Sequence, residues 1–123
     1  QAHNPNATSC WIGGFSFGAW ISMQLMMRRP EISGFISVAP PASLYDFSFL
    51  APCPSSGIII HGDADEIIPI ASVDKLNQKI SSQKNISIEY QIIKGGDHSF
   101  ADQIDILNGH VENYLNKVLT KAA

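Results

Sequence analysis

Charged residues are scarce in this sequence of 123 residues, since Asp, Glu, Lys and Arg make up only 15% of it. Eight Lys and Arg against eleven Asp and Glu give a net charge of −3, and the largest basic cluster is Arg28-Arg29. Nucleic-acid-binding domains normally carry a basic face, so that class is disfavoured. No apolar run approaches the roughly 20 residues that a membrane-spanning helix needs. No secretory leader is visible from Gln1 onward, and we expect a cytoplasmic protein that binds neither nucleic acid nor membrane.

Cysteine is also rare, with Cys10 and Cys53 as its two occurrences. Two cysteines in a core-rich chain are usually reduced and buried, whereas disulfide scaffolds are far denser in cysteine. The four histidines and two cysteines show no spacing typical of a zinc site, so no metal and no cofactor is expected. With 45% hydrophobic residues, the chain is long enough for one compact domain over residues 1–123 and too short for two.

What the sequence does contain is an alternation of short apolar runs and longer amphipathic segments. This alternation predicts strands over 9–13, 34–39, 57–61 and 86–93, and helices over 17–29, 71–83 and 101–121. Strands that alternate with helices in this way are typical of an α/β fold with a mostly parallel sheet. In such sheets, functional side chains gather in the loops that leave the carboxyl ends of the strands.

The loop after the first predicted strand contains a nucleophile-elbow motif, because residues 14–18 read Gly-Phe-Ser-Phe-Gly. This G-x-S-x-G pattern lies between a strand and a helix, which is the context the motif requires. Ser16 must occupy a strained turn that raises its hydroxyl above the sheet, and we expect a side chain at Gly14 or Gly18 to collide with that turn. The helix that begins at Phe17 would direct backbone N–H groups toward the reacting oxygen. An ordinary tight strand-to-helix turn is the alternative.

Two further loops carry candidate partners for a nucleophilic serine. The loop over 62–69 offers three carboxylates, Asp63, Asp65 and Glu66, any of which could orient a histidine. The loop over 95–100 places His98 after two glycines at the end of a strand. The adjacent Asp97 is interpreted as a turn residue. The other histidines lie in less suggestive places, and for His61, at a strand terminus, a structural hydrogen bond is the simplest interpretation.

The order serine, acid, histidine is that of the α/β-hydrolases. At these residues the chain resembles the C-terminal part of an α/β-hydrolase of the dienelactone hydrolase-like group. The segments 9–20 and 45–54 closely resemble small, largely uncharacterised bacterial serine hydrolases. In that family the acid follows a Gly-x-x-Asp-x-Ile/Val-x-Pro pattern, which the resemblance places on Asp65, with Asp63 as a decoy, and the histidine falls on His98. Dienelactone hydrolase itself uses a cysteine nucleophile where this sequence has Ser16, so its namesake reaction does not carry over.

The sequence departs from that family in what precedes the elbow. A complete member has several strands and helices before the nucleophile, whereas here the motif is reached at residue 16. We therefore expect a partial α/β-hydrolase fold that lacks the N-terminal strands but holds the whole triad. The second oxyanion donor normally comes from an earlier loop, so the Phe17 N–H would be the one donor this chain supplies. The strand over 9–13 would be an apolar edge that could pair with another chain.

The resulting hypothesis is a serine hydrolase of the carboxylesterase type. His98 would take the proton from Ser16, Asp65 would orient His98, and an acyl-enzyme would form on Ser16. The missing strands would come from a second polypeptide or from upstream sequence. A homo-oligomer through the strand at Ser9–Gly13 is the other partner expected. Two alternatives stay open, namely a catalytically silent fragment that acts as a structural or self-associating module, and a thioesterase or acyltransferase that uses the same triad.

The connection from Pro40 to Ser56 is long and irregular, a feature that is often functional, although it could equally be a loop packed over the core. It leaves no room for a large helical lid, which favours small ester-type substrates over lipids. We expect a substrate pocket formed by the aromatic side chains near the predicted triad, namely Phe15, Tyr45, Phe47, Phe49 and Phe100.

Overall fold

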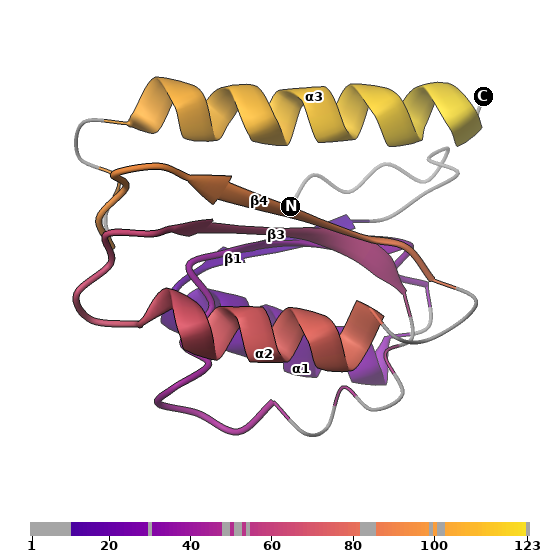
Figure 1. Ribbon diagram of the computed structural model, residues 1–123. Coiled ribbons are helices and arrows are strands. Elements are labelled where there is room, and N and C mark those ends of the chain that lie inside the picture. The colour runs from indigo at the N-terminus through magenta and orange to yellow at the C-terminus, as the bar shows by residue number, and fades with distance from the viewer. Residues whose placement is uncertain are drawn as a thin grey trace.

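The computed structural model describes residues 11–29, 31–47, 50, 53, 55–81, 86–98, 100 and 103–122. It contains four strands and three helices in the order expected from the sequence (Figure 1). These are β1 (Trp11–Phe15), α1 (Phe17–Arg28), β2 (Gly34–Val38), β3 (Ser56–Gly62), α2 (Ile70–Ser81), β4 (Ile88–Ile93) and α3 (Ile104–Ala122). The predicted and observed bounds differ by one to three residues at most ends. The first two residues of the predicted strand over 9–13 lie outside the described part of the chain.

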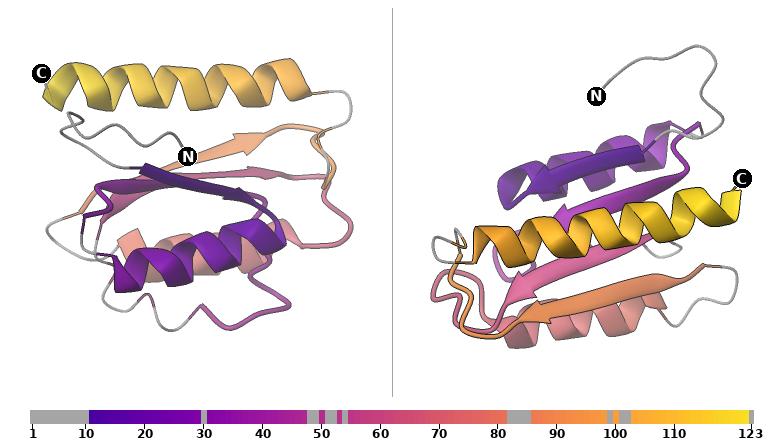
Figure 2. Two further views of the ribbon diagram at one scale, coloured as in Figure 1. Left: turned by 180° about the vertical axis from the view of Figure 1, so that it is seen from behind. Right: turned by 90° about the horizontal axis from the view of Figure 1, so that it is seen from above.

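All strand pairs are parallel, and the strands lie in the sheet in the order β1-β2-β3-β4. Helices α1 and α2 cover one face of this sheet, with α1 against β1 and β2 and α2 against β3 and β4, while α3 crosses the opposite face (Figures 1 and 2). The prediction of a mostly parallel sheet flanked by helices is therefore confirmed. Within the described residues β1 pairs with β2 alone, so β1 is an edge of the sheet.

Strand β3 is the most buried strand and separates the two halves of the core. Ile59 packs in the cluster beneath α1 and α2, together with Met23, Phe35 and Ile80. Ile58 and Ile60 point to the other face, where they pack in the cluster under α3. Three consecutive isoleucines are typical of a strand that is covered on both faces, which is what the structure has.

Two helices bury the faces that their sequence periodicity predicts. In α2 the side chains of Val73, Leu76 and Ile80 are buried, and the Tyr90 hydroxyl of β4 donates a hydrogen bond to Asp74 on the same helix. In α3 the buried side chains are Leu107 and Tyr114, whereas Ile104, which has the same spacing, is half exposed. None of the helices in the described part of the chain is long and apolar enough to span a membrane.

The connection between β2 and β3 is partly packed against the core, while its residues 43–46 are exposed. Phe47, Leu50 and Cys53 are buried among residues of α1, α2 and the sheet. The Cys53 thiol donates to the Ser55 carbonyl at 3.4 Å, and burial raises its pKa. Cys10, the other cysteine, lies outside the described residues. Of the two interpretations of this connection, the packed loop fits its buried residues.

Candidate active site

Ser16 occupies the sharp turn between β1 and α1 that its sequence motif predicts. Its backbone has φ 54° and ψ −121°, a conformation that residues other than glycine rarely adopt. A residue in such a conformation lowers the stability of the fold by on the order of 1–3 kcal/mol, and the conformation persists only where surrounding contacts hold it. One restraint is the hydrogen bond from the Ser16 N–H to the Val38 carbonyl at the end of β2, at 2.8 Å. The turn thus places the Ser16 side chain above the carboxyl end of the sheet.

The two glycines of the motif are not equivalent. A Cβ atom at Gly14 would lie 2.3 Å from the Gly18 carbonyl oxygen, so Gly14 must lack a side chain. A Cβ atom at Gly18 would meet nothing within 4 Å. The expectation that a side chain at Gly18 would collide with the turn is therefore wrong for the described part of the chain. The reason is that Gly18, in the first turn of α1, is directed away from the elbow and into open space.

Asp65 is fixed by backbone donors from its own loop. Its Oδ1 atom accepts hydrogen bonds from the N–H groups of Ile67 at 2.8 Å and Ile68 at 2.7 Å. Its Oδ2 atom accepts a hydrogen bond of 2.7 Å from Nδ1 of His98. Burial raises the pKa of Asp65, but the hydrogen bonds from Ile68, His98 and Ile67 outweigh it and hold the pKa below its ordinary value. The carboxyl group is therefore ionised at neutral pH although its side chain is fully buried.

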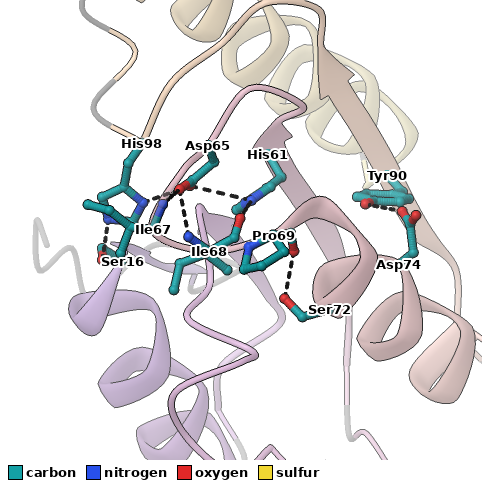
Figure 3. A network of polar contacts seen from close by, with 10 residues as sticks. All are labelled: Ser16, His61, Asp65, Ile67, Ile68, Pro69, Ser72, Asp74, Tyr90 and His98. Carbon is teal, nitrogen blue, oxygen red and sulfur yellow. Dashed lines mark hydrogen bonds and ion pairs between the residues drawn. The ribbon is translucent and has the colours of Figure 1, made fainter.

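His98 connects this carboxylate to the serine at the elbow. Its Nδ1–H faces Asp65, which leaves Nε2 as an acceptor, and the Ser16 hydroxyl donates to Nε2 at 2.8 Å. Figure 3 shows the three side chains in contact, with His98 between Ser16 at the start of α1 and Asp65 in the loop after β3. The structure thus brings together Ser16, Asp65 and His98, the three residues that the sequence singled out. This arrangement can move a proton from the serine hydroxyl to the imidazole while the carboxylate stabilises the resulting cation.

Asp63, in the same loop as Asp65, makes a contact outside the relay. Asp63 Oδ1 accepts a hydrogen bond of 2.7 Å from the N–H of Gly95, which links the loop after β3 to the loop after β4. A second link runs from the Ala64 N–H to the Gly96 carbonyl at 3.0 Å. A Cβ at Gly62 would lie 2.2 Å from that same carbonyl oxygen, so close approach of the two loops requires glycine there. Neither Asp63 nor Asp97 contacts the His98 ring in any hydrogen bond that the structure records. The tie between the loops was not predicted from the sequence.

The aromatic residues expected in a pocket fall into two groups. Phe15 is half exposed and lies against the His98 ring, with ring centroids 5.5 Å apart. Tyr45 is partly exposed, stacks on Trp20 at 4.7 Å and contacts Phe17. Phe47 and Phe100 are buried. Phe47 also lines a cavity of about 410 Å³ together with Tyr45, and Phe100 lies 6.4 Å from Phe15 between ring centroids, so their place in a substrate pocket stays a prediction. Phe49 lies outside the described residues.

A cavity of about 510 Å³ opens beside His98 and is lined by Ala64, Glu66, Ile67 and Asp97 as well as His98 itself. Opposite it, the first turn of α1 begins at Phe17, where backbone N–H groups have no partner within the helix. Among the described residues, no three His, Cys, Asp or Glu side chains are grouped as metal ligands would be. The site therefore combines a hydroxyl, an imidazole, a carboxylate and the N-terminus of a helix at one edge of the sheet.

Comparison with known proteins agrees with this geometry. The model of the Phospholipase/Carboxylesterase family matches residues 4–115. The chain belongs to this family of α/β-hydrolases. The α/β-hydrolase resemblance predicted from the sequence is thereby confirmed. A structure described as a dienelactone hydrolase, from Klebsiella pneumoniae, is 19% identical with a TM-score of 0.58, and that likeness shows the fold alone.

Individual known proteins are similar over most of the chain. An uncharacterized protein of Rickettsia prowazekii is 49% identical over 94% of the chain and 50% of its own length. A protein of unknown function from Agrobacterium tumefaciens, described as a candidate α/β-hydrolase, is 53% identical with a TM-score of 0.92, over 95% of this chain and 54% of its own. An α/β serine hydrolase homologue from Coxiella burnetii is 32% identical with a TM-score of 0.75, over 85% and 48%. The chain therefore spans about half the length of the relatives it matches.

Proposed function

We propose that this chain carries the nucleophile, base and acid of a serine hydrolase that cleaves carboxylic esters. The observation that supports this most directly is the continuous relay from the Ser16 hydroxyl through His98 to Asp65, with hydrogen bonds of 2.8 and 2.7 Å. Donor–acceptor distances in this range allow proton transfer within the site without rearrangement. Membership of the Phospholipase/Carboxylesterase family supports the same reaction class.

In the proposed reaction, Nε2 of His98 accepts the Ser16 proton as Oγ attacks the carbonyl carbon of the ester. The C–O bond to the alcohol then breaks, and Nε2 returns the proton to the departing oxygen. In the second half, water attacks the acyl carbon and gives a proton to Nε2 of His98. The bond between the acyl carbon and Oγ of Ser16 then breaks, Oγ takes the proton back from Nε2, and the carboxylic acid is released. The Phe17 N–H at the start of α1 would donate to the oxyanion in both halves, alongside a second donor from outside the described residues.

The cavity beside His98 is the proposed place for one side of the substrate, with Phe15 and Ile67 as exposed apolar contacts. Its open character favours small esters. Because the chain spans about half of its relatives, this substrate class is proposed for the complete site rather than for the chain alone.

The test is labelling by a fluorophosphonate probe, which reacts with an activated serine. The complete polypeptide or assembly in which the chain occurs should be labelled, and the Ser16→Ala variant should not. Ser72→Ala is the matched control, because Ser72 lies close to the site at the start of α2 but donates only to the Pro69 carbonyl. Equal labelling of the parent and the Ser16→Ala variant would contradict the proposal.

A thioesterase is the second candidate, because the chain is 28% identical over 76% of its length to acyl-protein thioesterase 1 of Eremothecium gossypii. The same three side chains would serve, since a thioester differs from an ester in its leaving group. The two candidates are separated by kcat/KM for an ester and a thioester of the same short acyl group. A preference of more than tenfold for either substrate decides between them.

The edge of the sheet supports a proposal about partners. Beside β1, the side chains of Phe17, Ile21 and Leu25 form a stripe on α1 that is 41–50% exposed. A strand edge next to exposed apolar side chains is a surface on which further strands and helices can pack. We propose that polypeptide from the remaining half of the fold, in the same or another chain, covers this surface. In sedimentation, we expect residues 1–123 by themselves to self-associate. A stable monomer with esterase turnover would exclude this proposal, and it would also exclude the alternative of a silent structural module.

A further inference from the structure

His61 is a buried histidine that the proposed reaction does not use. It lies next to the end of β3 and four residues before Asp65 in the sequence, and its side chain has no exposed area. A fully buried histidine loses hydration that its hydrogen bonds must replace. Its surroundings therefore indicate what the ring does in the folded protein.

The contacts of His61 are made by one nitrogen. Its Nε2 lies 2.9 Å from the Ile68 carbonyl oxygen and 3.4 Å from Oδ2 of Asp65. Because both of those atoms only accept hydrogen bonds, Nε2 must carry the proton. The other nitrogen, Nδ1, is buried and has no hydrogen-bond partner among the described residues. Burial lowers the pKa of His61, so the ring is neutral with its single proton directed at the Asp65 loop.

Ile68 links His61 to the carboxylate through its own peptide groups. Its N–H donates to Oδ1 of Asp65 at 2.7 Å, while its carbonyl accepts from His61. The turn that contains Asp65 is thus held from both sides, as Figure 3 shows. The His61 ring connects this turn to β3, the most buried strand of the sheet.

We propose that His61 is a positioning residue for Asp65. Its single Nε2–H binds the Ile68 carbonyl at 2.9 Å and lies 3.4 Å from Oδ2, and so keeps the carboxylate in the orientation that His98 requires. The inference rests on the proposed function, since orientation of Asp65 matters for turnover only if His98 acts as the base. The orientation of Asp65 must be accurate, because small displacements of catalytic groups lower the rate by large factors.

A purely structural role would have a different signature. If His61 only fills space, an apolar side chain of similar size should preserve turnover, apart from a general loss of stability. If the Nε2–H is what matters, Gln should substitute for His, because its amide nitrogen reaches the position of Nε2. Asn should not, because its shorter amide corresponds to Nδ1. His61→Gln and His61→Asn are therefore a matched pair that differs in reach and not in chemistry.

The experiment compares these variants in the complete polypeptide or assembly, with kcat, KM, the rate of fluorophosphonate labelling and the melting temperature as readouts. We expect His61→Leu and His61→Asn to lower kcat by about 10- to 100-fold at nearly unchanged KM, the range typical when support of an active group is lost. His61→Gln should stay within about fivefold of the parent. Ile60→Val, in the same strand, is the control that lowers the melting temperature and leaves kcat unchanged.

A double-mutant cycle with Asp65→Asn gives a readout that a structural role would not move. If His61 acts through Asp65, the loss in labelling rate caused by His61→Asn should largely disappear once Asp65 is Asn. A loss of the same size in both backgrounds would overturn the inference, and so would parent-like kcat in His61→Asn. If Ser16→Ala keeps its activity, the proposed function itself fails. If Ser16 is required and His61 is not, this inference alone fails.

Discussion

The two sides of the Ser16–His98–Asp65 relay differ in how much of their surroundings this chain supplies. On the acid–base side, Asp65 is buried and accepts three hydrogen bonds of 2.7–2.8 Å from Ile67, Ile68 and His98. On the nucleophile side, Phe15 and Phe17 flank Ser16 and are 45% and 50% exposed. The loops of β3 and β4 thus complete the acid–base side locally, whereas the nucleophile side borders an open edge. If further polypeptide completes the site, as proposed, the nucleophile side is where it would pack.

The largest effects should come from the three relay residues. Ser16→Ala or His98→Ala should lower kcat by about 10⁶-fold, since the hydroxyl and the imidazole act as one unit. Asp65→Asn should lower it by about 10⁴-fold, because the amide favours the wrong tautomer of His98. The measurement is kcat for an activated ester with the complete polypeptide. Additive losses in the Ser16→Ala, His98→Ala double variant would mean that the two residues do not act together.

Alanine at the two elbow glycines tests the contrast between packed and open surroundings. Gly14→Ala should destabilise the fold by about 3 kcal/mol, because its Cβ would lie 2.3 Å from a backbone oxygen. Gly18→Ala should stabilise residues 1–123 by up to about 1 kcal/mol, since alanine favours a helix. Urea unfolding measures both. In the complete polypeptide, destabilisation by Gly18→Ala instead would show that another segment fills the space beside it.

Asp63→Ala tests whether Asp63 links the two loops or instead serves as the acid of the relay. Loss of the hydrogen bond to the Gly95 N–H should reduce the free energy of unfolding by about 1 kcal/mol. The effect on kcat should be less than tenfold, far below that of Asp65→Asn. A loss of kcat near 10⁴-fold in Asp63→Ala would reverse the assignment of the two residues. Chemical denaturation and steady-state kinetics on the same samples provide both numbers.

The smallest expected effect is a pH dependence of stability that originates at His61. Its pKa is lowered in the folded state, so the unfolded chain takes up the proton first as the pH falls below about 6.5. Stability is therefore full above that pH and decreases below it, by at most about 1.4 kcal/mol per pH unit. His61→Gln should remove this part of the slope between pH 7 and 5. Equal slopes for parent and variant would contradict the prediction.

The sequence was sufficient to predict the elements and to single out Ser16 and His98, because these depend on local patterns. The Ile58–Ile60 run predicts a strand covered on both faces, and G-x-S-x-G between a strand and a helix predicts the turn at Ser16. The choice of Asp65 over Asp63 came from family resemblance, and the geometry now offers a physical reason. Asp63 faces the Gly95 N–H, whereas Asp65 faces His98.

What could not be predicted depends on contacts between distant segments. Phe15, Tyr45, Phe47 and Phe100 were expected around one pocket, but Phe47 lines a cavity with Tyr45, whereas Phe100 packs in the cluster under α3 beside Phe15. Local sequence does not say which face of a loop meets the core. A structural hydrogen bond was expected for His61 and is present, but its partner, the Ile68 carbonyl, follows from how the chain turns after β3. The sequence does show that His61 and Asp65 lie at the two ends of a short loop. That spacing alone does not say whether the His61 ring points toward the loop.

The backbone of Ser16 has a consequence for how this sequence can evolve. A glycine at position 16 would adopt φ 54° without strain, so the chain would be more stable with it. If the hydroxyl were not required for function, substitutions that replace Ser16 by glycine would therefore be favoured, because they would raise the stability of the fold. Ala39 and Phe100 share a positive φ, but at Ser16 the side chain also donates to His98, so retention of serine in relatives of this chain would report selection for the hydroxyl.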